Sequence, residues 1–338
     1  MLFGLFGSRV KPPASPPPVA VRAGQADALL KRLEWTVIRR LDGLLQGDYR
    51  TLMRGTGLDL ADLREYQLHD DVRHIDWNVT ARLQQPHVRV FTEDREMAAW
   101  FLLDLSPSVD FGSGTQRKRD VLQGFAGVLA RLLSRHGNRV GAMLYGGQGR
   151  AAVDTVLPAR GGRLQVLQLL QLLMAPPTVP SRSGTKPHGP THLAELLRAA
   201  QHTLRQRSTV FVVSDFISEP GWDKPLGELA RRHDVVAVRL LDPLELALPN
   251  LGLVTVRDAE TGEQMLVDTN DGGFRQRFAR IAAQREAELR EALARAGVDT
   301  LELSTDDDLA DAILRFVDLR RRRRGERLGL PAHLGVSA

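Results

Sequence analysis

The sequence contains no cysteine among its 338 residues. Disulfides and thiolate metal sites are therefore excluded, which leaves carboxylates, hydroxyls and imidazoles as possible metal ligands. The sequence also lacks any run of 18 or more apolar residues, so it predicts no membrane-spanning helix. The apolar N-terminus has neither the preceding basic region nor the small-residue cleavage site of a secretory signal. We therefore expect a cytoplasmic protein.

Aromatic side chains and net charge are also scarce over most of the chain. The sequence has only four Trp and three Tyr, and its formal net charge is +5. Residues 320–338 account for this whole charge, because they hold six arginines and one glutamate. No aromatic residues are interleaved with these arginines, so specific nucleic-acid binding is not predicted. The Arg-rich tail is expected to be solvated or to contact acidic surfaces.

Several sequence motifs of common enzymes are missing. No Gly-x-x-x-x-Gly-Lys-Ser/Thr loop is present, so intrinsic ATPase activity is not expected. The "GSG" at 112–114 does not have the spacing of a Gly-x-Ser-x-Gly nucleophile elbow. The "YGGQGR" at 145–150 lacks the third glycine of a dinucleotide fingerprint, and a tight turn between strands explains it more simply.

From Ala98 onward, strands that are apolar on both faces alternate with amphipathic helices. This pattern predicts an α/β fold with a doubly wound, mostly parallel sheet. The expected strands are 98–104, 139–145, 151–157, 209–215, 234–240 and 299–303. The expected helices are 117–136, 162–174, 191–205, 222–232, 273–296 and one from 306 into the tail. Two strand-like runs around "DAETGE" within 251–269 predict an inserted β-hairpin.

Composition divides the chain into four segments. Residues 1–22 form a Pro-rich lead that we expect to be disordered, and 320–338 are the Arg-rich tail. Residues 23–97 hold an amphipathic helix, expected from about Ala26 to Leu45 and packed on the main domain, and a charged segment with strand-like ends. Residues 98–319 form the main α/β domain, in which a long Pro-rich loop at 175–190 leads to Thr191.

Polar side chains collect where predicted strands of this sheet end. In "FLLDLSPSVDFGSG", residues 101–114, Asp104, Ser106 and Ser108 follow a buried strand, Thr191 opens a later helix, and Asp215 ends "TVFVVSD". Each residue alone could be a turn or helix cap. Because carboxyl ends of parallel strands meet at one edge, the five together form a set of hard oxygen ligands suited to Mg²⁺ or Mn²⁺. Water, or an acidic side chain of a partner protein, would complete the coordination of the ion.

At these residues the chain resembles the von Willebrand factor A domain. The metal-ion-dependent adhesion site of that family has an Asp-x-Ser-x-Ser strand end, a later Thr and a later Asp. The matching residues are Asp104, Ser106 and Ser108, then Thr191 in "GPTHLAELL", then Asp215 in "VVSDF". Phe216 follows Asp215 at a position where many family members have Gly. The resemblance implies a Rossmann-type fold and a metal site that recognises proteins.

A second resemblance covers the segment before this domain. The stretch "LREYQLHDDVRHIDWNVTAR", residues 63–82, is similar to the signature of a bacterial family catalogued as domain of unknown function 58. The matching residues are Arg64, Tyr66, Asp70, Asp71, Arg73, Asp76, Trp77, Ala81 and Arg82. That family joins such a segment to a von Willebrand factor A-like domain. Its members are often encoded beside MoxR-type AAA+ ATPases, so the resemblance implies an adaptor or assembly factor acting with such an ATPase.

The charges of this signature allow two physical interpretations. Its alternating Asp and Arg side chains could form a salt-bridged network that fastens the segment to the sheet, since Arg and carboxylate pair well. Alternatively, a second metal site could use His69, Asp70, Asp71, His74 and Asp76. The arginines compete for the same carboxylates, which argues against the second interpretation.

The sequence therefore predicts a non-enzymatic binding module that holds Mg²⁺ or Mn²⁺ at Asp104, Ser106, Ser108, Thr191 and Asp215. The first alternative is a metal-dependent hydrolase, of phosphoesterase type, on the same site, although the sequence places no His or Glu as a general base. The second alternative is a structural scaffold with a degenerate site that binds no ion.

Overall fold

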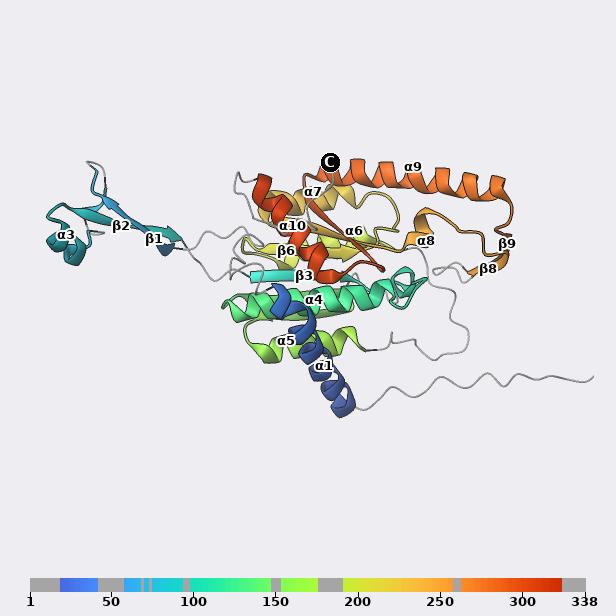
Figure 1. Cartoon of the computed structure of the whole chain (residues 1–338), viewed down its shortest axis with the longest axis horizontal. Coiled ribbons are helices and arrows are strands. Elements are labelled where there is room, and N and C mark those ends of the chain that lie inside the picture. The colour runs from blue at the N-terminus through green and yellow to red at the C-terminus, as the bar shows by residue number, and fades with distance from the viewer. Residues whose placement is uncertain are drawn as a thin grey trace, which may run out of the picture.

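The computed structural model describes residues 19–41, 58–67, 70–72, 75–93, 98–146, 153–175, 191–257 and 263–323. Its centre is a six-stranded sheet with helices on both faces (Figure 1). The strands, in the order in which they lie side by side, are β10 (Asp299–Ser304), β7 (Asp234–Leu241), β6 (Thr209–Ser214), β3 (Ala98–Asp104), β4 (Arg139–Tyr145) and β5 (Thr155–Arg160). All neighbouring pairs are parallel except β4 and β5, which are antiparallel. The predicted mixed α/β fold with a mostly parallel sheet is confirmed.

The strands form this sheet because their side chains are apolar on both faces. In β3, Phe101 and Leu103 belong to one hydrophobic core and Leu102 belongs to another on the opposite face. Phe211 of β6 stacks on Phe101 with ring centroids 5.2 Å apart. Successive residues of a strand point to opposite faces, so a run of apolar residues requires cover on both.

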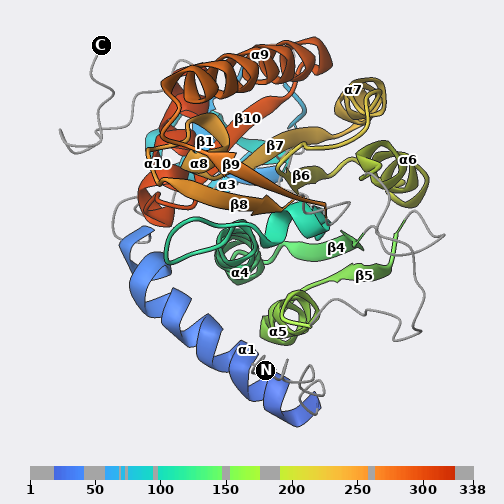
Figure 2. The same cartoon turned by 90° about the vertical axis from the view of Figure 1, so that its right-hand side faces the viewer.

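Helices provide this cover on both faces of the sheet (Figure 2). The first core is closed by α1 (Val19–Leu33), α4 (Lys118–Arg135), α5 (Arg163–Leu173) and α10 (Leu309–Arg323). The second core is closed by α6 (Leu193–Thr203), α7 (Asp223–Arg232) and α9 (Gly272–Ala296). The sheet is therefore doubly wound, as the sequence predicts.

The N-terminal helix packs on the main domain. α1 continues into a π-helical stretch, η1 (Glu34–Ile38), and contacts α4 and α5. Ala26, Leu30 and Ile38 of this helix are fully buried in the first core. The expected packing is confirmed, whereas the predicted end near Leu45 lies outside the described residues.

The signature segment forms a small unit of its own. β1 (Leu58–Glu65) and β2 (His87–Glu93) pair antiparallel, with α3 (Trp77–Leu83) between them in the chain. Figure 1 shows this unit standing clear of the main sheet. The expected small β-containing segment is therefore present.

The inserted hairpin and the edge strand of the main sheet are both present. The inserted hairpin is present as β8 (Leu253–Arg257) and β9 (Gln264–Asp268), which pair antiparallel. The edge strand predicted at 151–157 instead runs from Thr155 to Arg160 and is antiparallel to β4. Of the predicted disordered lead 1–22, residues 19–22 belong to α1, so that part of the prediction is wrong. Of the predicted solvated tail 320–338, residues 320–323 belong to α10, and Arg320 is buried because it pairs with Asp234. Residues 1–18 and 324–338 and most of the 175–190 loop lie outside the described residues.

Candidate metal centre

The candidate site lies where the direction of winding of the sheet reverses. β3 is the first strand of the sheet in the chain, and it lies between β4 on one side and β6 on the other. In open α/β sheets, ligands bind outside the carboxyl ends of the strands at this switch point. Asp104 is the last residue of β3 and pairs in register with Tyr145, the last residue of β4.

The Asp104 carboxylate is fully buried and held from two sides. Its Oδ1 accepts a hydrogen bond from the backbone N–H of Ser106 at 2.9 Å, and its Oδ2 accepts one from the Ser214 hydroxyl at 2.6 Å. Burial, and next the negative charge of Asp215, raise the pKa of Asp104 to about 6. Asp104 is thus a positioned carboxylate whose charge is incompletely compensated.

The two serines turn their hydroxyl groups toward each other, 3.1 Å apart (Ser106 Oγ to Ser108 Oγ). Both residues are buried, at the start of the short 3-10 helix η4 (Pro107–Asp110). Ser106 occupies the N-cap position of η4, yet its side chain makes no capping hydrogen bond. Simple capping therefore does not account for these hydroxyls.

Asp215 follows β6 directly and is nearly inaccessible. Its Oδ1 accepts from the backbone N–H of Ile217 at 3.0 Å, and its Oδ2 accepts from the Lys118 ammonium at 2.7 Å. The next residue, Phe216, has φ +59°, in the left-handed region that favours glycine. The ring of Phe216 packs on Trp222 with centroids 5.1 Å apart, which favours keeping a large side chain at this position.

Thr191 is buried and is fixed to the loop that follows Asp215. Its carbonyl oxygen accepts hydrogen bonds from the backbone N–H of Glu219 at 2.9 Å and from the Ser218 hydroxyl at 2.8 Å. The neighbouring N–H of His192 donates to the hydroxyl of Tyr145 at 2.9 Å. α6 begins at Leu193 with His192 as its N-cap, so Thr191 is not the cap of this helix. All five predicted residues thus lie at the same edge of the sheet.

Two charged residues of this edge are missed by the sequence interpretation. Lys118, the first residue of α4, is completely buried, and its ammonium donates to Glu245 at 2.6 Å as well as to Asp215. Burial works to lower the pKa of Lys118, but the charges of Asp215 and Glu245 outweigh it and raise the pKa. Burial raises the pKa of Glu245 above its ordinary value, although Lys118 acts in the opposite direction. In "QRKRD" the lysine looks like any charged residue at a helix start, so only the fold reveals it.

Asp242, after β7, forms a third polar strand end. It accepts hydrogen bonds from the backbone N–H and the hydroxyl of Ser113, from the N–H of Leu244 and from the hydroxyl of Thr305. Burial acts against ionisation, but these donors outweigh it and lower the pKa of Asp242. Through these hydrogen bonds Asp242 connects the loop before α4 with the residues after β7 and β10. The sequence could have indicated Asp242 as a site residue, because it is a carboxylate that directly follows an apolar strand.

The signature residues make contacts within their own unit. Arg64 binds both carboxylate oxygens of Asp70, at 2.8 and 2.6 Å, and Asp76 caps α3 by accepting from the N–H groups of Asn78 and Val79. The predicted salt bridge is therefore present, but it lies inside the segment. Of the other signature residues that the structure describes, Tyr66 is half-buried and Asp71, Trp77, Ala81 and Arg82 are exposed.

Of the alternative second metal site, Asp70 accepts from Arg64 and Asp76 caps α3, so the arginine competes for Asp70 as expected. His69, Arg73 and His74 lie outside the described residues.

The switch-point residues fit a hard divalent cation in chemistry and in charge. Their donors are carboxylates and hydroxyls, the ligands that Mg²⁺ and Mn²⁺ prefer. The single positive charge of Lys118 is shared between Asp215 and Glu245. Asp104 has no cationic partner within the described part of the chain, so negative charge remains at this edge for a cation to compensate. Among the described residues, no group of three or more His, Asp or Glu side chains is arranged to hold a metal ion, so the fit depends on the hydroxyls.

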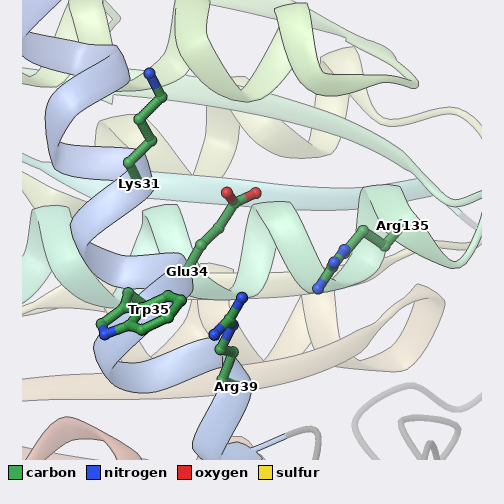
Figure 3. A pocket seen from close by; sticks show the side chains of 5 residues that line it. All are labelled: Lys31, Glu34, Trp35, Arg39 and Arg135. Carbon is green, nitrogen blue, oxygen red and sulfur yellow. The ribbon is translucent and has the colours of Figure 1, made fainter.

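Two surface hollows lie in the described part of the chain. One, of about 390 Å³, is lined by Lys31, Glu34, Trp35, Arg39 and Arg135 (Figure 3). Arg39 stacks on the exposed Trp35 ring at 3.7 Å from its centroid. The other, of about 700 Å³, lies between α1, the start of α4 and the residues after β10. Neither is lined by a predicted metal ligand.

The fold and this edge together define a doubly wound α/β protein with a polar site at its strand switch point. The chain belongs to the family described as protein of unknown function DUF58, whose model matches residues 62–288. Uncharacterized proteins of Mycobacterium tuberculosis and Mycobacterium bovis are 38% identical over 317 residues, covering 92% of this chain and 96% of theirs. The resemblance to the domain of unknown function 58 is thereby confirmed.

Solved structures match this chain at low sequence identity and with low TM-scores. The conserved hypothetical protein BatB from Bacteroides thetaiotaomicron is 16% identical with a TM-score of 0.42, and the match covers 67% of this chain and 99% of that one. An aerotolerance-related membrane protein from Bacteroides fragilis is 12% identical with a TM-score of 0.44 and the same coverage. Within the described residues of this chain, no helix is both long enough and apolar enough to span a membrane.

Proposed function

We propose that this protein is a non-enzymatic, divalent-metal-dependent module that binds other proteins. In this proposal the main domain is of the von Willebrand factor A type. Asp104 and Asp215 hold Mg²⁺ or Mn²⁺ directly or through water, and the hydroxyls of Ser106, Ser108 and Thr191 complete the protein's share of ligands. The proposal is supported by the placement of these five buried residues at the same edge of the sheet, at the strand switch point.

An acidic side chain of a partner protein would complete the coordination of the ion. Exposed apolar residues beside the site support a protein as the ligand: Phe111 is 40% exposed and Ile217 is 50% exposed. Ile217 donates its N–H to Asp215, and the Phe111 ring lies 5.9 Å from the Lys118 ammonium, so both flank the charged groups. Apolar side chains around a polar anchor are typical of protein interfaces.

The proposed partner is a MoxR-type AAA+ ATPase, with this chain as its adaptor or assembly factor in the cytoplasm. This choice rests on family resemblance. Capture of the purified ATPase by the immobilised protein in Mg²⁺, with loss in EDTA or in Ser106→Ala, is the expected result. Capture that survives both changes would show that the interaction uses another surface.

Calorimetric titration of Mg²⁺ tests the ion separately from the partner. The wild type should bind, and Asp104→Ala should not. Asp104→Asn keeps the shape of the side chain, so it separates the loss of a ligand from a folding defect. Equal binding in the wild type and both variants, or none in any of them, would contradict the metal site.

One observation favours a second candidate, a structural scaffold that binds no ion. The Lys118 ammonium already lies against Asp215 and supplies positive charge there. Under this alternative, Mg²⁺ at millimolar concentration changes neither the melting temperature nor the capture of a partner.

A further inference from the structure

The buried Lys118 ammonium is held by two carboxylate partners, with the Phe111 ring 5.9 Å away as a weaker favourable neighbour. Burial of an amine opposes its charge. Lys118 is also the first residue of α4, and the positive end of a helix dipole disfavours cations. The compensating contacts are Asp215 at 2.7 Å and Glu245 at 2.6 Å. The positive charge of Lys118 is therefore kept at the switch point by its interaction with these two carboxylates.

The backbone of the loop before α4 fixes the position of Lys118. Gly112 lies so close to the following turn that an added Cβ would meet the Gln116 carbonyl oxygen at 2.5 Å. The N–H of Lys118 donates to the carbonyl oxygen of Phe111 at 2.9 Å, which closes the loop. The hydroxyl and N–H of Ser113 in the same loop are held by Asp242. The side chain thus enters the site from a tightly fixed backbone.

Lys118 and an ion at this edge would use the same carboxylate. Both oxygens of Asp215 already accept a hydrogen bond, one from Ile217 and one from Lys118. A cation that takes Asp215 as a ligand therefore shares or displaces the ammonium. Glu245 offers Lys118 a second partner that remains after Asp215 is released.

We propose that Lys118 is the resident counter-ion of this site: it compensates Asp215 before a divalent cation arrives and competes with that cation for the carboxylate. This inference rests on the proposed function, because it assigns the group that sets the ion affinity of the same site. The competition makes the affinity for the ion lower than the carboxylates alone would give, and it lets the protein stay folded without an ion.

Titration of Mg²⁺ and Mn²⁺ into the full-length protein, freed of metal with EDTA and exchanged into buffer, tests the inference. Lys118→Met removes the charge, and we expect it to bind the ion at least about tenfold more tightly than the wild type. Glu245→Gln leaves Lys118 with Asp215 alone and should bind more weakly than the wild type. Melting temperatures with and without ion give a second readout, since a purely structural lysine would lower stability without raising the ion affinity.

A double variant tests whether tighter ion binding comes from the loss of competition at Asp215 or from the change in net charge of the site. It also covers the case in which Lys118→Met alone does not fold. The double variant Lys118→Met with Glu245→Gln loses one positive and one negative charge, so its formal net charge equals that of the wild type. It also avoids leaving the Glu245 carboxylate without the Lys118 ammonium that it binds in the wild type. We expect it to bind the ion more tightly than the wild type because Asp215 is free. Far-ultraviolet circular dichroism in EDTA checks that each variant is folded.

The outcomes distinguish this inference from the proposed function. Binding in the wild type that is tightened in both Lys118 variants supports both. Binding only in the Lys118 variants supports the counter-ion and overturns the metal-dependent function of the native chain. Equal or weaker binding in the Lys118 variants overturns the counter-ion and leaves the metal site standing, and no binding in any variant overturns both.

Discussion

Replacement of Asp104 by Asn should stabilise the protein in the absence of an ion. Burial, with the neighbouring Asp215, raises the pKa of Asp104 from 3.8 to about 6. A shift of about 2 pKa units corresponds to about 3 kcal/mol of unfavourable free energy in the ionised form. Asn carries no charge and fits the same space, its oxygen can accept from the Ser106 N–H, and the Ser214 hydroxyl can turn to accept from its amide. We expect Asp104→Asn to raise the free energy of unfolding in EDTA at pH 7.5 by about 1–3 kcal/mol.

The pH dependence of this effect has a definite sign. The folded-state pKa of Asp104 is above the unfolded value, so its contribution to wild-type stability is present below about pH 4 and is lost as the pH rises through about 6. The advantage of Asp104→Asn should therefore be absent near pH 4, develop between pH 4 and 6, and stay constant above. Urea unfolding followed by circular dichroism measures it.

A matched control uses the same substitution at a carboxylate that is fully paired. Asp234 accepts from the buried Arg320 at 2.9 Å through both oxygens. Asp234→Asn weakens this pair and should destabilise the protein by about 3 kcal/mol. If Asp104→Asn also destabilises the protein in EDTA at pH 7.5, or if its effect is the same at every pH, the reasoning on the uncompensated charge is refuted.

Three further predictions concern Phe216 and Ile217, which follow Asp215, and Arg64 of the signature unit. Phe216→Gly should be about 1 kcal/mol more stable than Phe216→Ala in urea unfolding, because both lose the contact with Trp222 and only Gly adopts φ +59° without strain; equal stability would contradict the strain. Ile217→Ser should reduce capture of the partner at least about tenfold and leave Mg²⁺ binding unchanged, since the exposed side chain flanks the ion site; unchanged capture would remove Ile217 from the interface. Arg64→Ala should change the free energy of unfolding by less than about 1 kcal/mol, because its pair with Asp70 is partly exposed; a larger loss would show that the pair anchors the signature unit.

The sheet was predictable because its strands are apolar on both faces and are separated by helices. Phe101, Leu102 and Leu103 all need burial, and only a doubly wound sheet covers both faces of such a strand. The direction of β5 was not predictable, because an edge strand has one neighbour and its alternation of half-buried and exposed residues fits either direction.

The location of Asp104, Ser106, Ser108, Thr191 and Asp215 at one edge was predictable because the carboxyl ends of parallel strands lie at the same edge of a sheet. Lys118 and Glu245 were not, since each lies at a helix start where charged residues are ordinary, and only tertiary folding brings them to Asp215. The partner of Arg64 was not predicted either. The charges of the signature segment suggested docking on the sheet, but Arg64 is satisfied by Asp70 six residues away.

The most direct test of the account is to locate the ion itself. Crystals of the full-length protein soaked in Mn²⁺ should give an anomalous-scattering peak within coordination distance of the Asp104 carboxylate and the hydroxyls of Ser106 and Ser108, and the peak should vanish in Asp104→Asn. The Lys118 ammonium should then have moved from Asp215 toward Glu245. No peak at this edge, with Lys118 still between the two carboxylates, would contradict the metal site.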